Sequence, residues 1–86
     1  MDPHAKLTAL IDLAESLGIR VRPAPAGEDA DRPGGAYVRL KGSEMVFLVP
    51  SAAPADQIDV LALAMKNRPQ LQDRFLPPEI RQLLEG

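Results

Sequence analysis

The sequence predicts an α+β fold in which a helix is followed by a three-stranded antiparallel sheet and two further helices. Three observations support this prediction. Residues 36–49 alternate between apolar and polar positions around a Gly-Ser pair, as the two strands of a β-hairpin do. Residues 3–17 and 54–67 each repeat apolar side chains at helical spacing. Hydrophobic residues form 45% of the chain, which is enough for the core of one small domain.

The hairpin at 36–49 is expected to turn at Gly42-Ser43, which places Tyr37 opposite Leu48 and Lys41 opposite Glu44. Side chains alternate between the two faces of a strand. One face is then wholly apolar: Ala36, Val38, Leu40, Met45, Phe47 and Val49. The other face is mixed: Tyr37, Arg39, Lys41, Glu44, Val46 and Leu48. We expect helices to cover the wholly apolar face.

The elements before the hairpin begin and end at recognisable residues. Asp2 can cap the first helix, Pro3 suits its first position, and Gly18 suits the left-handed residue that follows a helix. Residues 19–22 then alternate and predict a strand, with Arg20 and Arg22 pointing away from the core. Short connections favour an antiparallel meander of this strand with the hairpin.

A polar segment at 23–35 separates the first strand from the hairpin. It is rich in proline, glycine and charged residues and has no large apolar side chain, so we expect a mobile loop within a single domain spanning residues 1–86. Its acidic residues lack the spacing of a calcium-binding loop. Gly34-Gly35 is followed by neither a lysine nor a helix start, which favours a flexible connection over a phosphate loop.

The C-terminal half predicts two helices that pack on the sheet. Apolar residues surround almost the whole circumference of the helix at 54–67, so this helix is expected to be the most buried. Leu71, Phe75 and Leu76 are expected to return the chain to the core, and Pro77-Pro78 opens a short last helix.

The composition argues against an enzyme, a cofactor and a metal site. Cysteine is absent, which excludes thiolate chemistry, and the only histidine is His4 in the first helical turn. Ser16, Ser43 and Ser51 each occupy a helix end or a turn, where a serine has a structural role. No apolar run approaches the length of about 20 residues that spans a membrane. We therefore expect a soluble, cytoplasmic protein without a membrane contact and without a catalytic residue.

The mixed face of the hairpin is the candidate binding surface. Its basic row, extended by the first strand, is Arg20, Arg22, Arg39 and Lys41. Its apolar anchors are Tyr37, Val46 and Leu48. A monomer should not leave these anchors bare, so either residues 71–76 cover them or a partner does. The leading hypothesis is a homodimer or another protein bound at this face, and it predicts that Leu48→Lys weakens association while the fold stays intact.

Polyanion binding through the basic row is the alternative hypothesis. Lysine and arginine side chains on one face could contact phosphates. However, the net charge of −2 gives no general attraction to nucleic acid, and Tyr37 alone is available for base stacking. The sequence therefore disfavours nucleic acid as the partner.

Two resemblances add to this interpretation. The segments LGI at 17–19, GG-x-x-x-RLKG at 34–42, MVFLVP at 45–50 and LPPEIRQLL at 76–84 resemble small, uncharacterised bacterial proteins, which implies no activity. The strand that leads through a proline-containing turn into an apolar helix is similar in layout to the N-terminal core of ImmA/IrrE-type zincin peptidases. That family has H-E-x-x-H on this helix, whereas residues 61–68 read LALAMKNR. The resemblance therefore implies a degenerate, metal-free relative with no catalytic residue.

Overall fold

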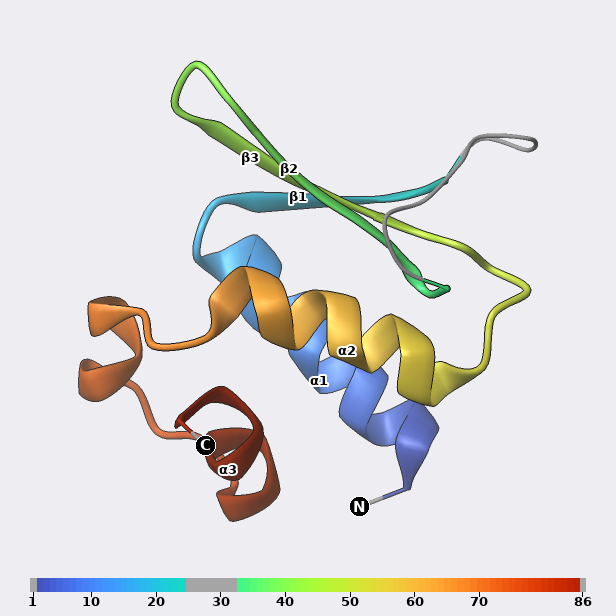
Figure 1. The fold of residues 1–86 in the computed structure, drawn as a ribbon. Helices are drawn as coiled ribbons and strands as arrows, with labels where there is room; N and C mark the ends of the chain where they lie inside the picture. Colours follow the sequence, from blue (N-terminus) through green and yellow to red (C-terminus); the bar gives the residue numbers. More distant parts are fainter. Residues whose placement is uncertain (1, 25–32, 86) are drawn as a thin grey trace.

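The computed structural model describes residues 2–24 and 33–85 of the chain. The fold class is α+β, as predicted. The elements follow in the order α1 (Pro3–Ser16), β1 (Ile19–Pro23), β2 (Gly35–Leu40), β3 (Ser43–Leu48), α2 (Pro54–Met65), the 3₁₀ helix η1 (Pro69–Asp73) and α3 (Pro78–Glu85). Figure 1 shows α1 and α2 side by side on one face of the sheet, with α3 on the far side of them from the sheet.

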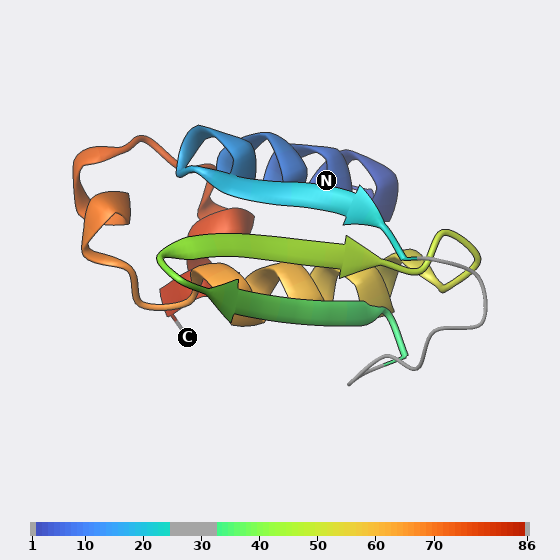
Figure 2. The ribbon, with the colours of Figure 1, turned by 90° about the horizontal axis from the view of Figure 1, so that it is seen from above.

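The three strands form a mixed sheet in the order β1-β3-β2, so the prediction of a purely antiparallel meander is wrong. β2 is antiparallel to β3, whereas β1 is parallel to β3 (Figure 2). The connection from β1 to β2 starts and finishes at the same end of β3. The Ala24 N–H donates to the Leu48 carbonyl at 2.7 Å, and the Val49 N–H donates to the Gly34 carbonyl at 2.9 Å. β1 therefore pairs with the central strand β3 instead of with β2.

The hairpin turns at Lys41-Gly42, one residue before the predicted position. Lys41 has φ 50° and Gly42 has φ 81°, the positive values that a two-residue type I′ turn requires. This turn places Tyr37 opposite Val46 and Arg39 opposite Glu44. The partner predicted for each β2 residue was two residues further along β3. Because side chains alternate with a period of two, each side chain of the hairpin still lies on the face predicted for it.

The helices cover the mixed face of the hairpin, not the wholly apolar one. Val46 is 0% exposed and Leu48 is 6% exposed, whereas Val38 and Leu40 are 40% and 66% exposed. The pairing of β1 with β3 explains this arrangement. Val21 lies beside Val46, so the inward side of β1 coincides with the mixed face, and α1 leads directly into β1 on that side.

The core lies between the sheet and the helices and is aliphatic, as the composition predicts. Its fully buried side chains are Leu10, Ala14, Ile19, Val46, Val60, Leu61, Met65, Ile80 and Leu84. α2 has the most buried residues of the described helices, as predicted, although it ends at Met65 rather than Asn67. Asn67 has φ 59°, and its N–H donates to the Leu84 carbonyl at 3.0 Å, which connects the end of α2 to α3.

Gly34 and Gly35 allow two close backbone approaches and are not a flexible connection. A Cβ atom on Gly34 would lie 2.1 Å from the Asp56 carbonyl oxygen, where α2 begins. Gly35 has φ 147°, and a Cβ atom there would lie 1.8 Å from the Phe47 carbonyl oxygen. These glycines therefore pack the start of β2 against α2 and β3. The remainder of the predicted loop, residues 25–32, lies outside the described residues.

The segment between η1 and α3 returns Leu71 and Leu76 to the core but not Phe75. Phe75 is 91% exposed, so its predicted burial is wrong. The backbone at this point is held by Arg74, whose Nη1 donates to Ser16 Oγ at 2.7 Å and whose carbonyl accepts from Arg81 Nη2 at 3.0 Å. Neighbouring side chains in extended backbone point in opposite directions, so burial of Leu76 directs Phe75 to solvent.

Candidate functional site

The candidate site is the face of the sheet opposite the helices, named the open face below. The strand pairings place on it the side chains of Arg20, Arg22, Ala36, Val38, Leu40, Ser43, Met45 and Phe47. In Figure 2 the strands lie in front of the helices, and no helix of the described chain crosses this face. The open face is therefore an accessible surface built entirely on regular strands.

The centre of the open face is apolar. Ala36 lies opposite Phe47, and Val38 lies opposite Met45. Together with Leu40 on β2, these residues form a continuous apolar strip on β2 and β3. Val38 and Leu40 are exposed, and Met45 and Phe47 are half-buried. The uncovered face of an antiparallel hairpin is ordinarily polar. This strip is thus unusual for a surface that only faces water.

The edge of the open face along β1 is basic. Arg20 pairs in register with Met45, and Arg22 pairs with Phe47, so both arginine side chains flank the apolar strip. Both residues are exposed, and Arg22 Nη1 donates to the Val21 carbonyl at 2.9 Å. Glu44, the one acidic residue of the described strands, points to the helices instead. On the open face, the described strands therefore carry positive charge and no carboxylate.

The residues predicted as binding anchors lie elsewhere. Val46 and Leu48 are core residues under α1 and α2, and Tyr37 is half-buried on the same face. The expectation was that residues 71–76 or a partner cover them, whereas α1 and α2 cover them in the structure. Leu48→Lys would therefore place an ammonium group in the core. Figure 1 shows that α1 and α2, rather than residues 71–76, lie directly against this face.

The predicted basic row is divided between different parts of the sheet. Arg20 and Arg22 lie on the open face, Arg39 lies opposite Glu44 on the helix-covered side, and Lys41 lies in the turn. The prediction assumed that β1 extends the hairpin as a meander. Because β1 instead pairs with β3 in parallel, its arginines share a face with Met45 and Phe47.

A polar cluster of Tyr37, Glu44 and Arg68 joins the sheet to the end of α2. Arg68 Nη1 donates to Glu44 Oε1 at 3.0 Å, and Nη2 forms an ion pair with Oε2. The Tyr37 hydroxyl also donates to Oε2, and Arg68 Nε donates to the Ala64 carbonyl at 2.9 Å. This cluster was not predicted from the sequence, because nothing near Arg68 in the chain indicates Glu44 as its partner.

The pKa shifts in the cluster of Tyr37, Glu44 and Arg68 move each group further from neutrality. The hydrogen bonds from Arg68, and next from Tyr37, lower the pKa of Glu44 to about 2. Burial raises the pKa of Tyr37, and the neighbouring Glu44 adds to the shift. At neutral pH Glu44 is therefore ionised while Tyr37 and Arg68 keep their protons. No member of the cluster titrates near neutrality, so the cluster suits a structural tie and not proton transfer.

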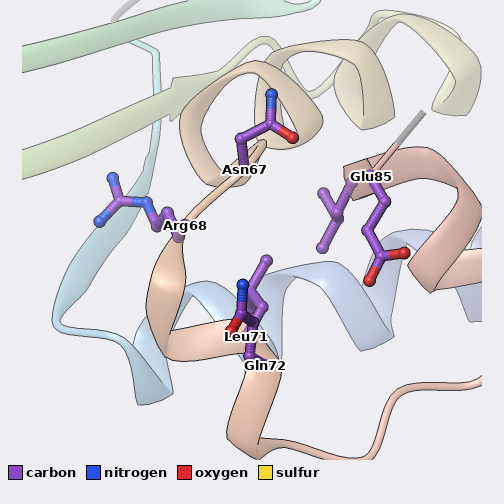
Figure 3. Close-up of a pocket in the computed structure, with 6 residues that line it drawn as sticks. Asn67, Arg68, Leu71, Gln72 and Glu85 are labelled. Carbon is purple, nitrogen blue, oxygen red and sulfur yellow. The ribbon is translucent and has the colours of Figure 1, made fainter.

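Two open hollows lie beside this cluster. One, of about 460 Å³, is lined by Asn67, Arg68, Leu71, Gln72, Leu84 and Glu85. Figure 3 shows that the Arg68 guanidinium points away from the other labelled side chains of this hollow. Glu85 in this hollow accepts a hydrogen bond from Arg81 Nη1 at 2.5 Å. The neutral polar side chains that line the hollow are those of Asn67 and Gln72. The second hollow, of about 380 Å³, is lined in part by Tyr37 and Glu44.

The remaining candidates for chemistry are dispersed. Within residues 2–24 and 33–85, no group of three or more His, Cys, Asp or Glu side chains could hold a metal ion. Ser16 Oγ donates to the Leu13 carbonyl at 2.7 Å, as a helix-end serine is expected to do. His4 is exposed on α1. None of the helices that the structure describes is both long and apolar enough to cross a membrane.

Comparison of the chain with protein-family models, with curated proteins and with solved structures finds no match. The likeness of the layout to ImmA/IrrE-type peptidases therefore stays a prediction from sequence.

Proposed function

We propose that this chain is a non-enzymatic binding module that binds another protein on its open face. The observation that supports this proposal is the apolar strip, whose large side chains are Val38, Leu40, Met45 and Phe47, on regular strands that nothing in the described chain covers. Fully burying a side chain of this size is worth about 1.5–3 kcal/mol, so a partner that covers the strip gains binding energy at several positions.

The proposed anchors replace the ones expected from sequence. Val38 and Leu40 project from β2, and Met45 and Phe47 project from the central strand β3. All four belong to the hairpin, whose backbone is fixed by ladder hydrogen bonds and by the type I′ turn. A rigid platform of this kind loses little conformational entropy when a partner binds.

The polar cluster supports a non-enzymatic role. Glu44 is the carboxylate with the largest pKa shift in the described chain, and that shift keeps it ionised and paired with Arg68. Polyanion binding has less support, because the basic row is divided and Tyr37 is held by Glu44 beneath the helices. Protein binding at the open face is therefore the function that the geometry supports best.

Site-specific photo-crosslinking in living cells tests this proposal. Benzoylphenylalanine in place of Leu40 reports contacts of the open face, and the same residue in place of Glu15, which is exposed on α1, is the matched control. We expect a discrete crosslinked adduct from position 40 that position 15 does not give. Adding Val38→Asp to the position 40 variant should remove the adduct. The same adducts from both positions, or none from position 40, would contradict the proposal.

A further inference from the structure

We infer that the partner places an acidic amphipathic helix along the open face. This inference rests on the proposed function, and it specifies the chemistry of the occupant. Its basis is the combination of three features of the open face: its small width, its apolar centre and the two arginines along one edge, which form no ion pair with another described residue.

The size of the open face fits a single helix. Strands of six residues and three strands in width give a flat area of about 20 Å by 15 Å, or roughly 300 Å². A standard stable interface buries about 800 Å² on each partner, so the face is too small to hold a folded dimer by itself. A helix is about 10–12 Å wide with its side chains, and about 13 residues of it span 20 Å. Such a helix would cover the sheet as α1 and α2 cover its other face.

The charge of the open face indicates what the helix must contain. Arg20 and Arg22 flank the apolar strip, and no carboxylate of the described strands shares their face. The described strands of a second copy stacked on this face would bring two more arginines and no acidic group to partner the buried guanidinium groups. A helix with carboxylates beside its apolar stripe supplies those partners.

The spacing of the two arginines fits the spacing of side chains on a helix. Arg20 and Arg22 are two residues apart on β1, so they are about 6.6 Å apart along the strand. Two glutamates four residues apart on a helix have Cβ atoms about 5–6 Å apart. The geometry therefore matches a helix that runs along the strands with a Glu-x-x-x-Glu pair over β1 and leucine-like anchors over β2 and β3. An anionic membrane surface fits less well, because recruitment to it usually uses four or more clustered basic residues, about twice the number here.

Two synthetic helical peptides of about 14 residues test the inference. Both carry one leucine stripe at helical spacing. The first has glutamates at i and i+4 on the flank of the stripe, and the second has lysines at the same two places. We expect the glutamate peptide to shift the amide resonances of Val38, Leu40, Met45 and Phe47 in the isotope-labelled protein. We expect the lysine peptide to bind about tenfold more weakly or worse, and the difference to shrink at high salt.

Charge reversal separates this contact from a general effect of net charge. The variant Arg20→Glu with Arg22→Glu should lose at least about tenfold in affinity for the glutamate peptide and should gain affinity for the lysine peptide. The matched control is Lys6→Glu with Lys66→Glu, which changes the net charge equally but on the helical side of the molecule. The control should bind both peptides as the wild-type protein does.

The outcomes distinguish the inference from the proposed function. Equal binding of both peptides at the open face would overturn the acidic helix but keep a docking face. Binding of neither peptide, together with no crosslinked adduct from position 40, would overturn both. Binding to vesicles of anionic lipid without binding to the glutamate peptide would identify a membrane as the ligand. A dimer in light scattering that Leu40→Asp dissociates would identify a second copy as the occupant.

Discussion

Both carboxylate oxygens of Glu44, on the central strand, are bound by the guanidinium of Arg68, which lies just beyond α2. The two side chains are 18% and 17% exposed, so this pair is largely shielded from water. A bidentate contact fixes the angle between the two groups as well as their distance. The end of α2 is thereby held against the sheet, on the side opposite to the open face.

The Glu44–Arg68 pair should make the stability of the protein sensitive to acid. The pKa of Glu44 is about 2 in the folded protein and about 4.5 when unfolded. Because the folded pKa is lower, the pair contributes its full stability above pH 4.5 and loses it as the pH falls towards 2. We expect the free energy of unfolding to fall by about 2–3 kcal/mol over this range through this group. Urea unfolding at a series of pH values measures the change.

Glu44→Gln should remove most of that acid sensitivity. Glu85→Gln is the matched control, since Glu85 also pairs with an arginine but its side chain is 54% exposed. We expect Glu85→Gln to follow the wild-type pH dependence. An unchanged slope for Glu44→Gln between pH 4.5 and 2 would show that Glu44 is not the acid-sensitive group.

Removal of the Arg68 side chain should destabilise the protein more than removal of the Arg39 side chain, which also lies near Glu44. Arg68→Ala leaves the shielded Glu44 carboxylate without its main partner, which costs about 1.5–3 kcal/mol. Arg39 is exposed and lies opposite Glu44, and Arg39→Ala should change stability by less than about 0.5 kcal/mol. Chemical unfolding of both variants at neutral pH makes the comparison. Equal losses would mean that the two arginines share the carboxylate.

Two truncations on the same hairpin test which face of the sheet is covered. Val46 is 0% exposed, and Val46→Ala should destabilise the protein by about 2 kcal/mol. Leu40→Ala should have an effect below about 0.5 kcal/mol, because Leu40 is 66% exposed. Thermal unfolding of the two variants measures both effects. The opposite ranking would show that the helices cover the wholly apolar face instead.

The turn residues provide a test of the hairpin register. Lys41 has a left-handed conformation that asparagine tolerates better than lysine, so Lys41→Asn should preserve or raise the melting temperature. Gly42→Ala should destabilise the protein by about 1 kcal/mol, since Gly42 has φ 81°. Ser43→Ala serves as a control within β3. A destabilising Lys41→Asn with a neutral Gly42→Ala would contradict the type I′ turn.

The features that were predicted correctly from sequence are those set by neighbouring residues. The Asp2 side chain caps α1 by accepting from the Ala5 N–H at 2.9 Å, and the alternation in residues 36–49 places the side chains on two faces as expected. The features predicted wrongly depend on distant parts of the chain. Val38 and Val46 are equally apolar, and only the pairing of β1 with β3 decides which of them α1 and α2 cover.

The candidate site was predicted on the wrong face of the sheet for the same reason. The prediction from sequence rested on burial of the more apolar face, which left Val46 and Leu48 in need of a covering partner and Leu40 without one. The amount of apolar surface on each face does not determine against which face of the sheet α1 packs. Likewise, the ion pair of Glu44 with Arg68 has no local signature, because each residue separately suits an exposed position in a strand or after a helix.

Both ends of the described chain emerge on the helical side of the molecule. α1 begins at Pro3 and α3 ends at Glu85, and Figure 1 shows both points away from the sheet. An affinity handle, a fluorescent reporter or a sensor-chip tether attached just before α1 or just after α3 would therefore start on the side of the helices away from the strands. Immobilised in this way, every molecule would present the same surface to a dissolved analyte.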